Sequence, residues 1–354
     1  MRTITYSEAV HEAIDYVLSN YSDTVLIGEG VPDPKGVFGT TSGLRKKYGP
    51  ERVLDMPLAE NGMTGICIGA ALNGLRPIMV HQRIDFSLLA LDQIANNAAK
   101  WHYMFDGQAS VPLVIRLIVG RGWGQGPQHS QSLHHIFAQI PGLKVVAPVT
   151  AQDAKGMLIA AVADDNPVIF VEHRWLHDVL GQVSETSDER PLCGAEILRI
   201  GEHITIVAIS QMVIEALRAA EALKQVGVEA EVIDMRVLNP LDVDTVVKSV
   251  RKTGLLLVVD TACMQASLGH VIISLALGAC FSELRQAPRL IANPDCPVPT
   301  SHFLAAFYYS EAYDIGLAAL ELLAFPKQTR AEIQRLLTRC QPTDIPNRNF
   351  LGPF

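Results

Sequence analysis

Two side chains with clear potential for acid–base chemistry lie in the first half of the chain, beside segments that predict strands and helices. Glu60 separates a short apolar stretch from the glycine-rich residues 62–74, which predict a closely packed helix. A carboxylate in such a buried position needs a partner, or it must share a proton with a ligand atom. Acidic residues also favour the first turn of any helix, so a capping role for Glu60 stays open.

His129 is the second candidate, because it directly follows the glycine-rich residues 120–126 and a predicted strand at 111–119. The glycine pattern matches neither G-x-G-x-x-G nor G-x-x-x-x-G-K-[ST]. Ligands bind at the carboxyl ends of strands in α/β sheets, so we expect a site-forming loop, with a plain connection as the alternative. His134 and His135 lack the spacing and the carboxylate of a metal site, and we expect them on a helix surface without a function.

Oxygen-bearing side chains gather ahead of a further predicted strand, at Asp164, Asp165 and Asn166. Such a cluster ordinarily forms a turn. Clustered oxygen donors can also hold a cation, and the sequence leaves both readings open.

Strands and helices alternate along the chain, which predicts a mostly parallel sheet covered on both faces. In the first half we expect strands at 24–28, 52–59, 77–80, 111–119, 143–147 and 167–171, and helices at 62–74, 87–105 and 151–163. A polar, turn-rich stretch follows, and then strands at 204–210, 229–234 and 254–260 with helices at 211–226, 242–251 and 267–280. We therefore expect a first domain over residues 1–182, a linker over 183–193, a smaller α/β domain over 194–325 and a C-terminal extension over 326–354.

The composition is that of a well-packed globular protein. The chain has 354 residues, of which 49% are hydrophobic and 19% charged, and this excludes a disordered polypeptide. The net charge is −8 and no long basic run occurs, so we expect no nucleic-acid partner. The six cysteines show no C-x-x-C pair, and neither a signal sequence nor a bilayer-spanning apolar stretch is recognisable. These features predict a cytoplasmic protein without a membrane partner.

Together these segments resemble the β subunit of the thiamine-diphosphate-dependent decarboxylase component of 2-oxo acid dehydrogenase complexes, of the pyruvate, branched-chain and acetoin types. The likeness covers residues 4–325, and its most specific motifs are 57–60 (PLAE), 69–77 (GAALNGLRP), 84–87 (IDFS), 129–131 (HSQ), 141–146 (PGLKVV) and 153–156 (DAKG). It implies an α/β fold: a doubly wound, pyrimidine-binding thiamine diphosphate domain and a smaller transketolase C-terminal-like domain. The implied activity is decarboxylation of a 2-oxo acid and transfer of the acyl group to a lipoyl acceptor.

The resemblance also implies roles for single residues. Glu60 would hydrogen-bond a ring nitrogen of the cofactor's aminopyrimidine and so promote the proton transfer that activates it. Phe86 would stack on the pyrimidine, and Gln82 is a further implied cofactor-binding residue. His129 would face the substrate and assist acyl transfer as a proton donor. A structural potassium site is implied at Leu113, Ala161, Val162, Asp164 and Asn166.

The chain contains no Gly-Asp-Gly sequence, the motif through which thiamine enzymes hold the diphosphate by way of Mg²⁺. In the resembled family this motif lies on a separate α subunit. The resemblance therefore implies an α₂β₂ heterotetramer in which this chain supplies only the pyrimidine half of each site. A lipoylated acyltransferase is a further implied partner, although residues 260–270 and those beyond 325, where the family docks it, depart from the family pattern.

Three more residues depart from the family near the implied substrate pocket, namely Arg83, Arg121 and Trp123. With His129 they would line this pocket, and the two added cations favour an acidic or larger 2-oxo acid than pyruvate. They also keep open a split transketolase-like or biosynthetic thiamine-dependent ketol/acyl transferase that delivers its unit to an aldehyde. A non-catalytic scaffold is a third reading, and the joint presence of Glu60, Phe86 and His129 argues against it.

Overall fold

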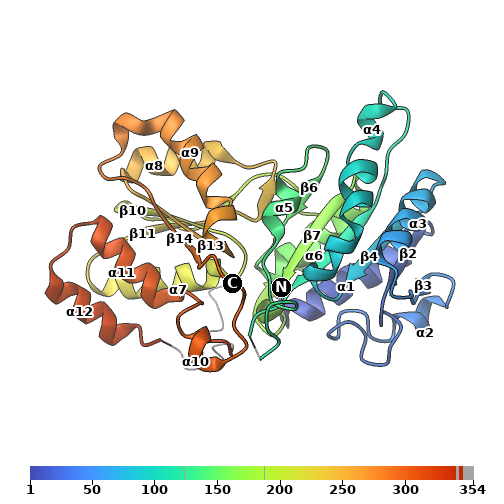
Figure 1. Ribbon diagram of the computed structural model, residues 1–354, viewed down its shortest axis with the longest axis horizontal. Coiled ribbons are helices and arrows are strands. Elements are labelled where there is room, and N and C mark those ends of the chain that lie inside the picture. The colour runs from blue at the N-terminus through green and yellow to red at the C-terminus, as the bar shows by residue number, and fades with distance from the viewer. Residues whose placement is uncertain (123, 187, 340–342, 346–354) are drawn as a thin grey trace.

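The computed structural model describes residues 1–122, 124–186, 188–339 and 343–345. Two α/β units lie side by side, each with a central sheet between helices (Figure 1). This arrangement confirms the predicted fold class. Buried apolar residues of both units belong to the same two large core clusters, so the units pack directly against each other.

The first unit is built on a seven-stranded sheet in which every strand except the antiparallel edge strand β12 runs parallel to its neighbours. The strand order is β12 (Val237–Asn239), β6 (Lys144–Val146), β7 (Val168–His173), β5 (Val114–Val119), β4 (Arg76–His81), β2 (Thr24–Gly28) and β3 (Val53–Leu54). All six residues of β5 are buried. Side chains alternate along a strand, so Ile115 and Leu117 enter one core cluster while Val114 and Ile118 enter the other.

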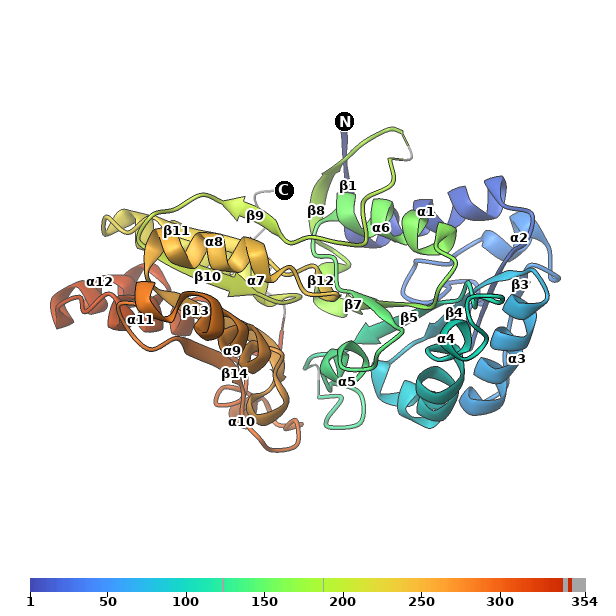
Figure 2. The same ribbon diagram turned by 90° about the horizontal axis from the view of Figure 1, so that it is seen from above.

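Helices cover both faces of this sheet (Figure 2). One face carries α1 (Tyr6–Asn20) and α6 (Ala151–Ala163), and the other carries α3 (Glu60–Leu72), α4 (Trp101–Met104) and α5 (His134–Ala138). The short α2 (Leu44–Tyr48) precedes β3, and β1 (Arg2–Thr5) pairs with β8 (Leu180–Val183) in a separate two-stranded ribbon. Thr5 and Thr150 cap α1 and α6 by accepting backbone N–H groups of the first turn, which explains where these helices begin.

The second unit has a five-stranded sheet in the order β14 (Arg289–Asn293), β13 (Leu256–Cys263), β10 (Ile204–Ala208), β11 (Ala230–Asp234) and β9 (Glu196–Arg199). Only β9 is antiparallel to its neighbour. One face is covered by α8 (Val243–Thr253) and α9 (Gly269–Cys280), and the other by α7 (Met212–Gln225), α11 (Ala312–Leu322) and α12 (Lys327–Leu336) (Figure 1). The short α10 (His302–Ala305) lies between β14 and α11 in the chain.

The predicted helix over residues 87–105 is wrong. This stretch contains a 3₁₀ segment (Ile84–Ala90), a π-helical segment (Gln93–Ala98) and the four-residue α4. The Ser87 hydroxyl donates to the carbonyl of Ile84, and the amide of Gln93 donates to the side chain of Asn61 on α3. Such local and lateral hydrogen bonds compete with a regular helical pattern.

The domain boundaries drawn from the sequence stay a prediction, and two contacts cross them. Strand β12 belongs to the second half of the chain but pairs with β6 of the first sheet. Helix α12 begins inside the predicted extension, and its Ile333 is fully buried in the core beside α11, where it lies close to Gly316. The first part of the extension is therefore packed into the second unit.

Candidate active site

Glu60 is the first residue of α3, directly after the short strand β3 and its loop. Its side chain is buried, with 8% of the residue exposed, yet no described residue donates a hydrogen bond to the carboxylate. The opposite face of α3 is open, because Gly62 and Gly69 lie about half a turn around the helix from Glu60 and a Cβ added to either would meet no atom within 4 Å. A buried acceptor without a donor is a feature that a ligand can satisfy.

Phe86 and His129 come together although they belong to separate loops. Their ring centroids lie 5.4 Å apart at an interplanar angle of 89°, an edge-to-face contact. Phe86 lies on the 3₁₀ segment that packs against α3, and the His129 residue is exposed. Gly120 packs closely against the backbone of His129, since a Cβ at Gly120 would lie 2.0 Å from the His129 carbonyl oxygen. Only glycine allows this approach.

Gln82 and Arg83 follow strand β4 and contact the loops that follow β2 and β5. The Gln82 amide donates to the carbonyl of Glu29 at 2.8 Å. The Arg83 guanidinium donates to Gln125 of the glycine-rich loop at 3.0 Å and lies 4.8 Å from the centroid of the Phe38 ring. The carboxyl ends of β2, β4 and β5 thus meet where α/β folds place their ligands.

Asp85 is a residue whose role the sequence did not reveal. Its Oδ1 accepts from the side-chain amide of Gln131 at 2.7 Å, and its Oδ2 is buried with no hydrogen-bond partner. Burial raises the pKa of this carboxyl. The only signal in the sequence is an acid between Ile84 and Phe86, and it carries no information on contacts.

Arg121 points away from this group and toward the second unit. Its guanidinium lies 4.0 Å from the ring centroid of Trp175 and 4.2 Å from that of Tyr309, and it donates to Gln211 at 3.0 Å. The expected place of Arg121 in a substrate pocket stays a prediction. Trp123, predicted for the same pocket, lies outside the described residues.

The expectation that His134 and His135 lie on a helix surface is wrong for His134, and His135 is half-buried, while their lack of a function stays a prediction. Helix α5 packs between the two units, and His134 is fully buried with its Nε2 3.0 Å from Oδ1 of Asp260 on β13. Although burial opposes ionisation, His134 lowers the pKa of Asp260 to about 2. Burial and the neighbouring His134 lower the pKa of His135 to about 4. No pattern in the sequence indicates that α5 faces a second unit.

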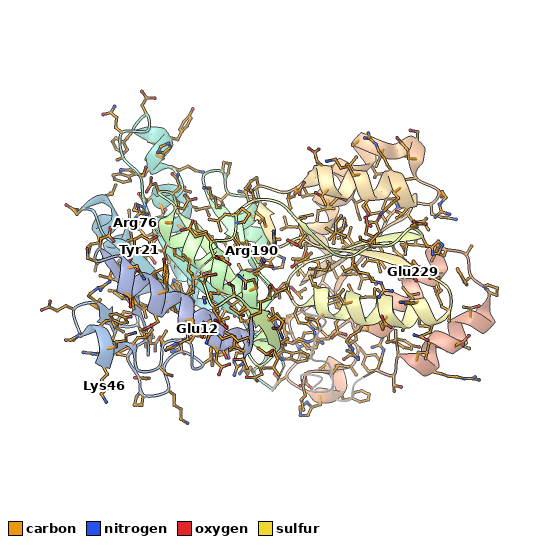
Figure 3. All side chains as sticks on the ribbon, turned by 180° about the vertical axis from the view of Figure 1, so that it is seen from behind. Glu12, Tyr21, Lys46, Arg76, Arg190 and Glu229 are labelled. Atoms are coloured by element: carbon orange, nitrogen blue, oxygen red, sulfur yellow. The ribbon has the colours of Figure 1, made fainter. Side chains whose placement is uncertain are left out.

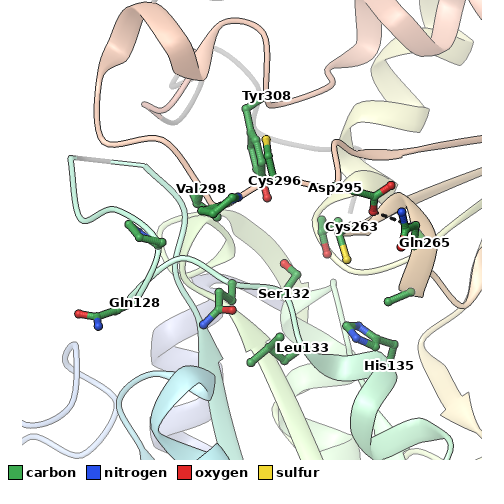
Figure 4. A pocket seen from close by; sticks show the side chains of 15 residues that line it. Gln128, Ser132, Leu133, His135, Cys263, Gln265, Asp295, Cys296, Val298 and Tyr308 are labelled. Atoms are coloured by element: carbon green, nitrogen blue, oxygen red, sulfur yellow. Dashed lines mark hydrogen bonds between the residues drawn. The ribbon is translucent and has the colours of Figure 1, made fainter.

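His135 also lines a cavity of about 620 Å³ between the loop after His129 and the second unit (Figure 4). Side chains from both units line it, among them Gln131, Leu133, Cys263, Asp295, Cys296 and Tyr308. Glu60, Phe86 and His129 do not. The three residues that the sequence motifs single out for catalysis and cofactor binding therefore do not line this cavity.

The residues of the predicted potassium site surround the turn before β7. Arg76, labelled in Figure 3, donates to the carbonyl oxygens of Val162 at 2.9 Å and Asp164 at 3.0 Å. Lys144 forms an ion pair with the Asp164 carboxylate, which also accepts the backbone N–H of Asn166 at 2.9 Å. The turn reading thus fits the geometry, and the cation remains a prediction. Among the described residues, no group of three or more His, Cys, Asp or Glu side chains is arranged to hold a metal ion.

Two domain families match the chain in the order of its two units. Residues 2–178 match the transketolase pyrimidine-binding domain and residues 194–314 the transketolase C-terminal domain. A solved split-gene transketolase, described as an inactive β4 tetramer, superimposes with a TM-score of 0.73 at 22% identity, over 91% of this chain and 99% of that one. Fold and site together define a transketolase-like two-domain protein.

Two curated relatives make the assignment more specific. The β subunit of acetoin:2,6-dichlorophenolindophenol oxidoreductase from Cupriavidus necator is 42% identical over 328 residues, which is 90% of this chain and 97% of the relative. The β subunit of the pyruvate dehydrogenase E1 component from Rickettsia bellii is 38% identical over 312 residues, 88% and 96% of the two chains. The chain belongs to this family of 2-oxo acid dehydrogenase β subunits. Family membership implies dependence on thiamine diphosphate and an α-subunit partner. Within the described part of the chain, no helix is long and apolar enough to cross a membrane.

Proposed function

We propose that this chain is the β subunit of a thiamine-diphosphate-dependent 2-oxo acid dehydrogenase, which decarboxylates a 2-oxo acid and transfers the acyl group to a lipoyl acceptor. The observation that carries the proposal is the Glu60 carboxylate, buried and without a hydrogen-bond donor among the described residues at the N-terminal end of α3. The nearby contact between Phe86 and His129 supplies an aromatic face and an exposed imidazole.

The residues present fit the pyrimidine half of the cofactor. Glu60 would accept a hydrogen bond from a ring nitrogen of the cofactor or share a proton with it. No described residue donates to this carboxylate, so the ring nitrogen would have no competitor. Phe86 would pack against the ring, and Gln82, fixed by the Glu29 carbonyl, would border it. When bound, thiamine diphosphate supplies the nucleophilic carbon and the electron sink for decarboxylation.

The other candidate residues would act on the substrate and the acceptor. His129, oriented by its contact with Phe86, would deliver a proton to the acceptor during acyl transfer. Arg83 is 7% exposed and its guanidinium borders the glycine-rich loop through Gln125, a place from which it would pair with a substrate carboxylate. The positive charge of Arg83 in this position would favour an acidic 2-oxo acid as substrate.

The diphosphate and Mg²⁺ would be held by the α subunit, because this chain has no Gly-Asp-Gly sequence. We propose an α₂β₂ heterotetramer in which the open face of α3 is completed by that subunit, with a lipoylated acyltransferase as a further partner. Exposed apolar side chains on α3, just before it and on the 3₁₀ segment that packs against it support a protein partner here, namely Ile66, Leu58 and Leu89.

A structural K⁺ at the turn before β7 belongs to the same proposal. Backbone carbonyls of Leu113, Ala161 and Val162, with Asp164 and Asn166, are suited to a large monovalent cation. Arg76 and Lys144 already neutralise part of this oxygen cluster. K⁺ would therefore add to an internally stabilised turn.

A second candidate is a split transketolase-like or biosynthetic thiamine-dependent transferase. The observation in its favour is that Arg83 and Arg174 both lie within 5 Å of the Phe38 ring centroid, at 4.8 and 4.9 Å. Two neighbouring cations suit a phosphorylated sugar acceptor. Product analysis with lipoamide and with a sugar phosphate as rival acceptors separates the two.

The test is Glu60→Gln in the chain assembled with an α subunit that carries a Gly-Asp-Gly sequence. Turnover of 2-oxo acids with 2,6-dichlorophenolindophenol as electron acceptor should fall at least ~100-fold, since general acid–base contributions reach 10²–10⁴-fold. The matched control is Glu51→Gln, an exposed acid of the same unit. Wild-type turnover by Glu60→Gln with intact assembly contradicts the proposal.

A further inference from the structure

Arg121 belongs to the glycine-rich loop of the first unit and contacts residues of the second unit. The residue is 3% exposed, and its guanidinium lies between the rings of Trp175 and Tyr309. Gln211, at the start of α7, accepts from its Nη1, and the Trp175 indole N–H donates to the Arg121 carbonyl at 2.9 Å. Both the side chain and the backbone of Arg121 are therefore fixed.

A short C-terminal segment completes this arrangement. The carbonyl oxygen of Thr343 accepts from Nη2 of Arg121 at 3.0 Å, across 222 residues of sequence. Asp344 packs on Gly122 so closely that a Cβ there would lie 2.0 Å from the Asp344 carbonyl oxygen. The Asp344 carboxylate in turn lies 2.7 Å from Nδ1 of His302. Thr343 and Asp344 are both buried, so this contact is part of the packed protein.

The loop that Arg121 anchors also holds His129. Its first residue, Gly120, packs against the His129 carbonyl, and the His129 N–H donates to the carbonyl of Gly126 at 3.4 Å. Gln125 of the same loop accepts from Arg83. A displacement of residues 120–126 would therefore move His129 and Arg83 together.

We infer that Arg121 is a positioning residue. Through its contacts with Tyr309, Gln211 and Thr343 it ties the glycine-rich loop to the second unit and the C-terminal segment, and so sets the place of His129. The inference rests on the proposed function, in which His129 acts on the acceptor. A planar, multiply hydrogen-bonded guanidinium between two rings is a role that lysine cannot reproduce.

The test compares Arg121→Gln, Arg121→Lys and a chain that stops after Arg339 with the wild type, each assembled with the α subunit. All three should lower kcat about tenfold or more, because a displaced catalytic group loses its orientation, and should raise KM for the 2-oxo acid, because Arg83 moves with the loop. Hydrogen exchange of residues 120–131 should rise in each variant. Arg289→Gln, a surface arginine paired with Glu321, is the matched control and should leave both readouts unchanged.

The outcomes separate this inference from the proposed function. Unchanged kcat and unchanged hydrogen exchange of residues 120–131 in both Arg121 variants would overturn the positioning role. Faster exchange with wild-type kcat would overturn it too, because the loop would then not matter for His129. Lack of 2-oxo acid turnover by the wild-type pair would instead count against the proposed function. The exchange measurement would still report on the contacts of Arg121.

Discussion

Two buried charged groups, Glu60 on α3 and Arg121 on the glycine-rich loop, differ in how far this chain satisfies them. Glu60 is buried with no donor among the described residues, and Gly62 and Gly69 on the opposite face of the same helix face open space. The Arg121 guanidinium has two hydrogen-bond acceptors and two aromatic rings, all supplied by this chain, while its buried Nε lacks a partner. Most of the partners of Arg121 thus lie within this chain, whereas the Glu60 carboxylate has none among the described residues. The difference supports a binding partner at α3 rather than at Arg121.

The largest effect should come from blocking the open region. In Gly69→Leu the new Cβ meets no described atom within 4 Å, so the fold should persist and the helix should gain intrinsic propensity. Assembly with the α subunit should be lost, and turnover should fall at least ~100-fold with it, since a bulky group now occupies the proposed contact face. Size-exclusion chromatography with light scattering measures the assembly.

Gly278→Leu provides the matched control, because Gly278 also lies on a helix and also faces open space, but in the second unit. Normal assembly of Gly69→Leu with the α subunit would contradict this prediction, since the open face would then not be where the partner binds.

Inside the first unit, Arg116 and Glu172 form a second buried charged group whose main partner lies within this chain. Both side chains are fully buried, with Arg116 Nε 2.6 Å from Glu172 Oε1. Glu172→Gln should lower the free energy of unfolding by about 3–5 kcal/mol, as for other buried pairs that lose one partner. Urea denaturation measures this change.

Exposed pairs of the same kind set the scale for that experiment. Arg2→Gln, which breaks the partly exposed contact with Glu12 and leaves the pair of Glu12 with Lys155 in place, should cost at most about 1 kcal/mol. Equal costs for the two variants would show that burial does not govern these pairs.

The contact of His134 with Asp260 should be visible in the pH dependence of stability. The pKa of Asp260 is lowered to about 2, so the ionised carboxylate stabilises the fold above its unfolded pKa of about 3.9. This stabilisation is lost as the pH falls from about 4 through about 2. Asp260→Asn should therefore flatten the acid limb of a plot of unfolding free energy against pH.

A steeper acid limb in Asp260→Asn than in the wild type would contradict the assigned direction of the pKa shift. Asp165→Asn is the control, because this carboxylate is largely exposed and its removal should leave the acid limb nearly unchanged.

The smallest effect concerns the turn before β7. Because Arg76 and Lys144 already pair with its oxygens, replacing Na⁺ by K⁺ at constant ionic strength should raise Tm by only a few degrees. Differential scanning calorimetry measures this shift, and Asn166→Ala should reduce it. Identical Tm values in the two salts would argue against the potassium site.

The sequence predicts those parts of the fold whose signal is local. The helix over residues 151–163 lies where its cap and pattern place it, and the parallel strands follow their apolar runs. Strand β12 has only three residues and gains its pairing from β6, so no local pattern announces it. Strand β14 and helix α11 were not predicted either, although α11 has a local signal in the capping box of Glu311 and Asp314.

For the candidate site, the sequence indicated which residues could do chemistry but not which residues they contact. The expectation that Phe86 and His129 share a site agrees with their ring contact. The direction of Arg121 and the burial of His134 depend on partners far along the chain, Thr343 and Asp260. Contacts at such sequence separation are decided by the packing of the two units, which a periodicity argument does not reach.

The most direct measurement of the central claim is calorimetric titration of thiamine diphosphate with Mg²⁺ into this chain alone and into its assembly with the α subunit. We predict binding only by the assembly, because Glu60, Phe86 and Gln82 offer only the pyrimidine half of the site. Equally tight binding by the isolated chain would contradict a shared site, and absence of binding by a correctly assembled pair would contradict the proposed cofactor.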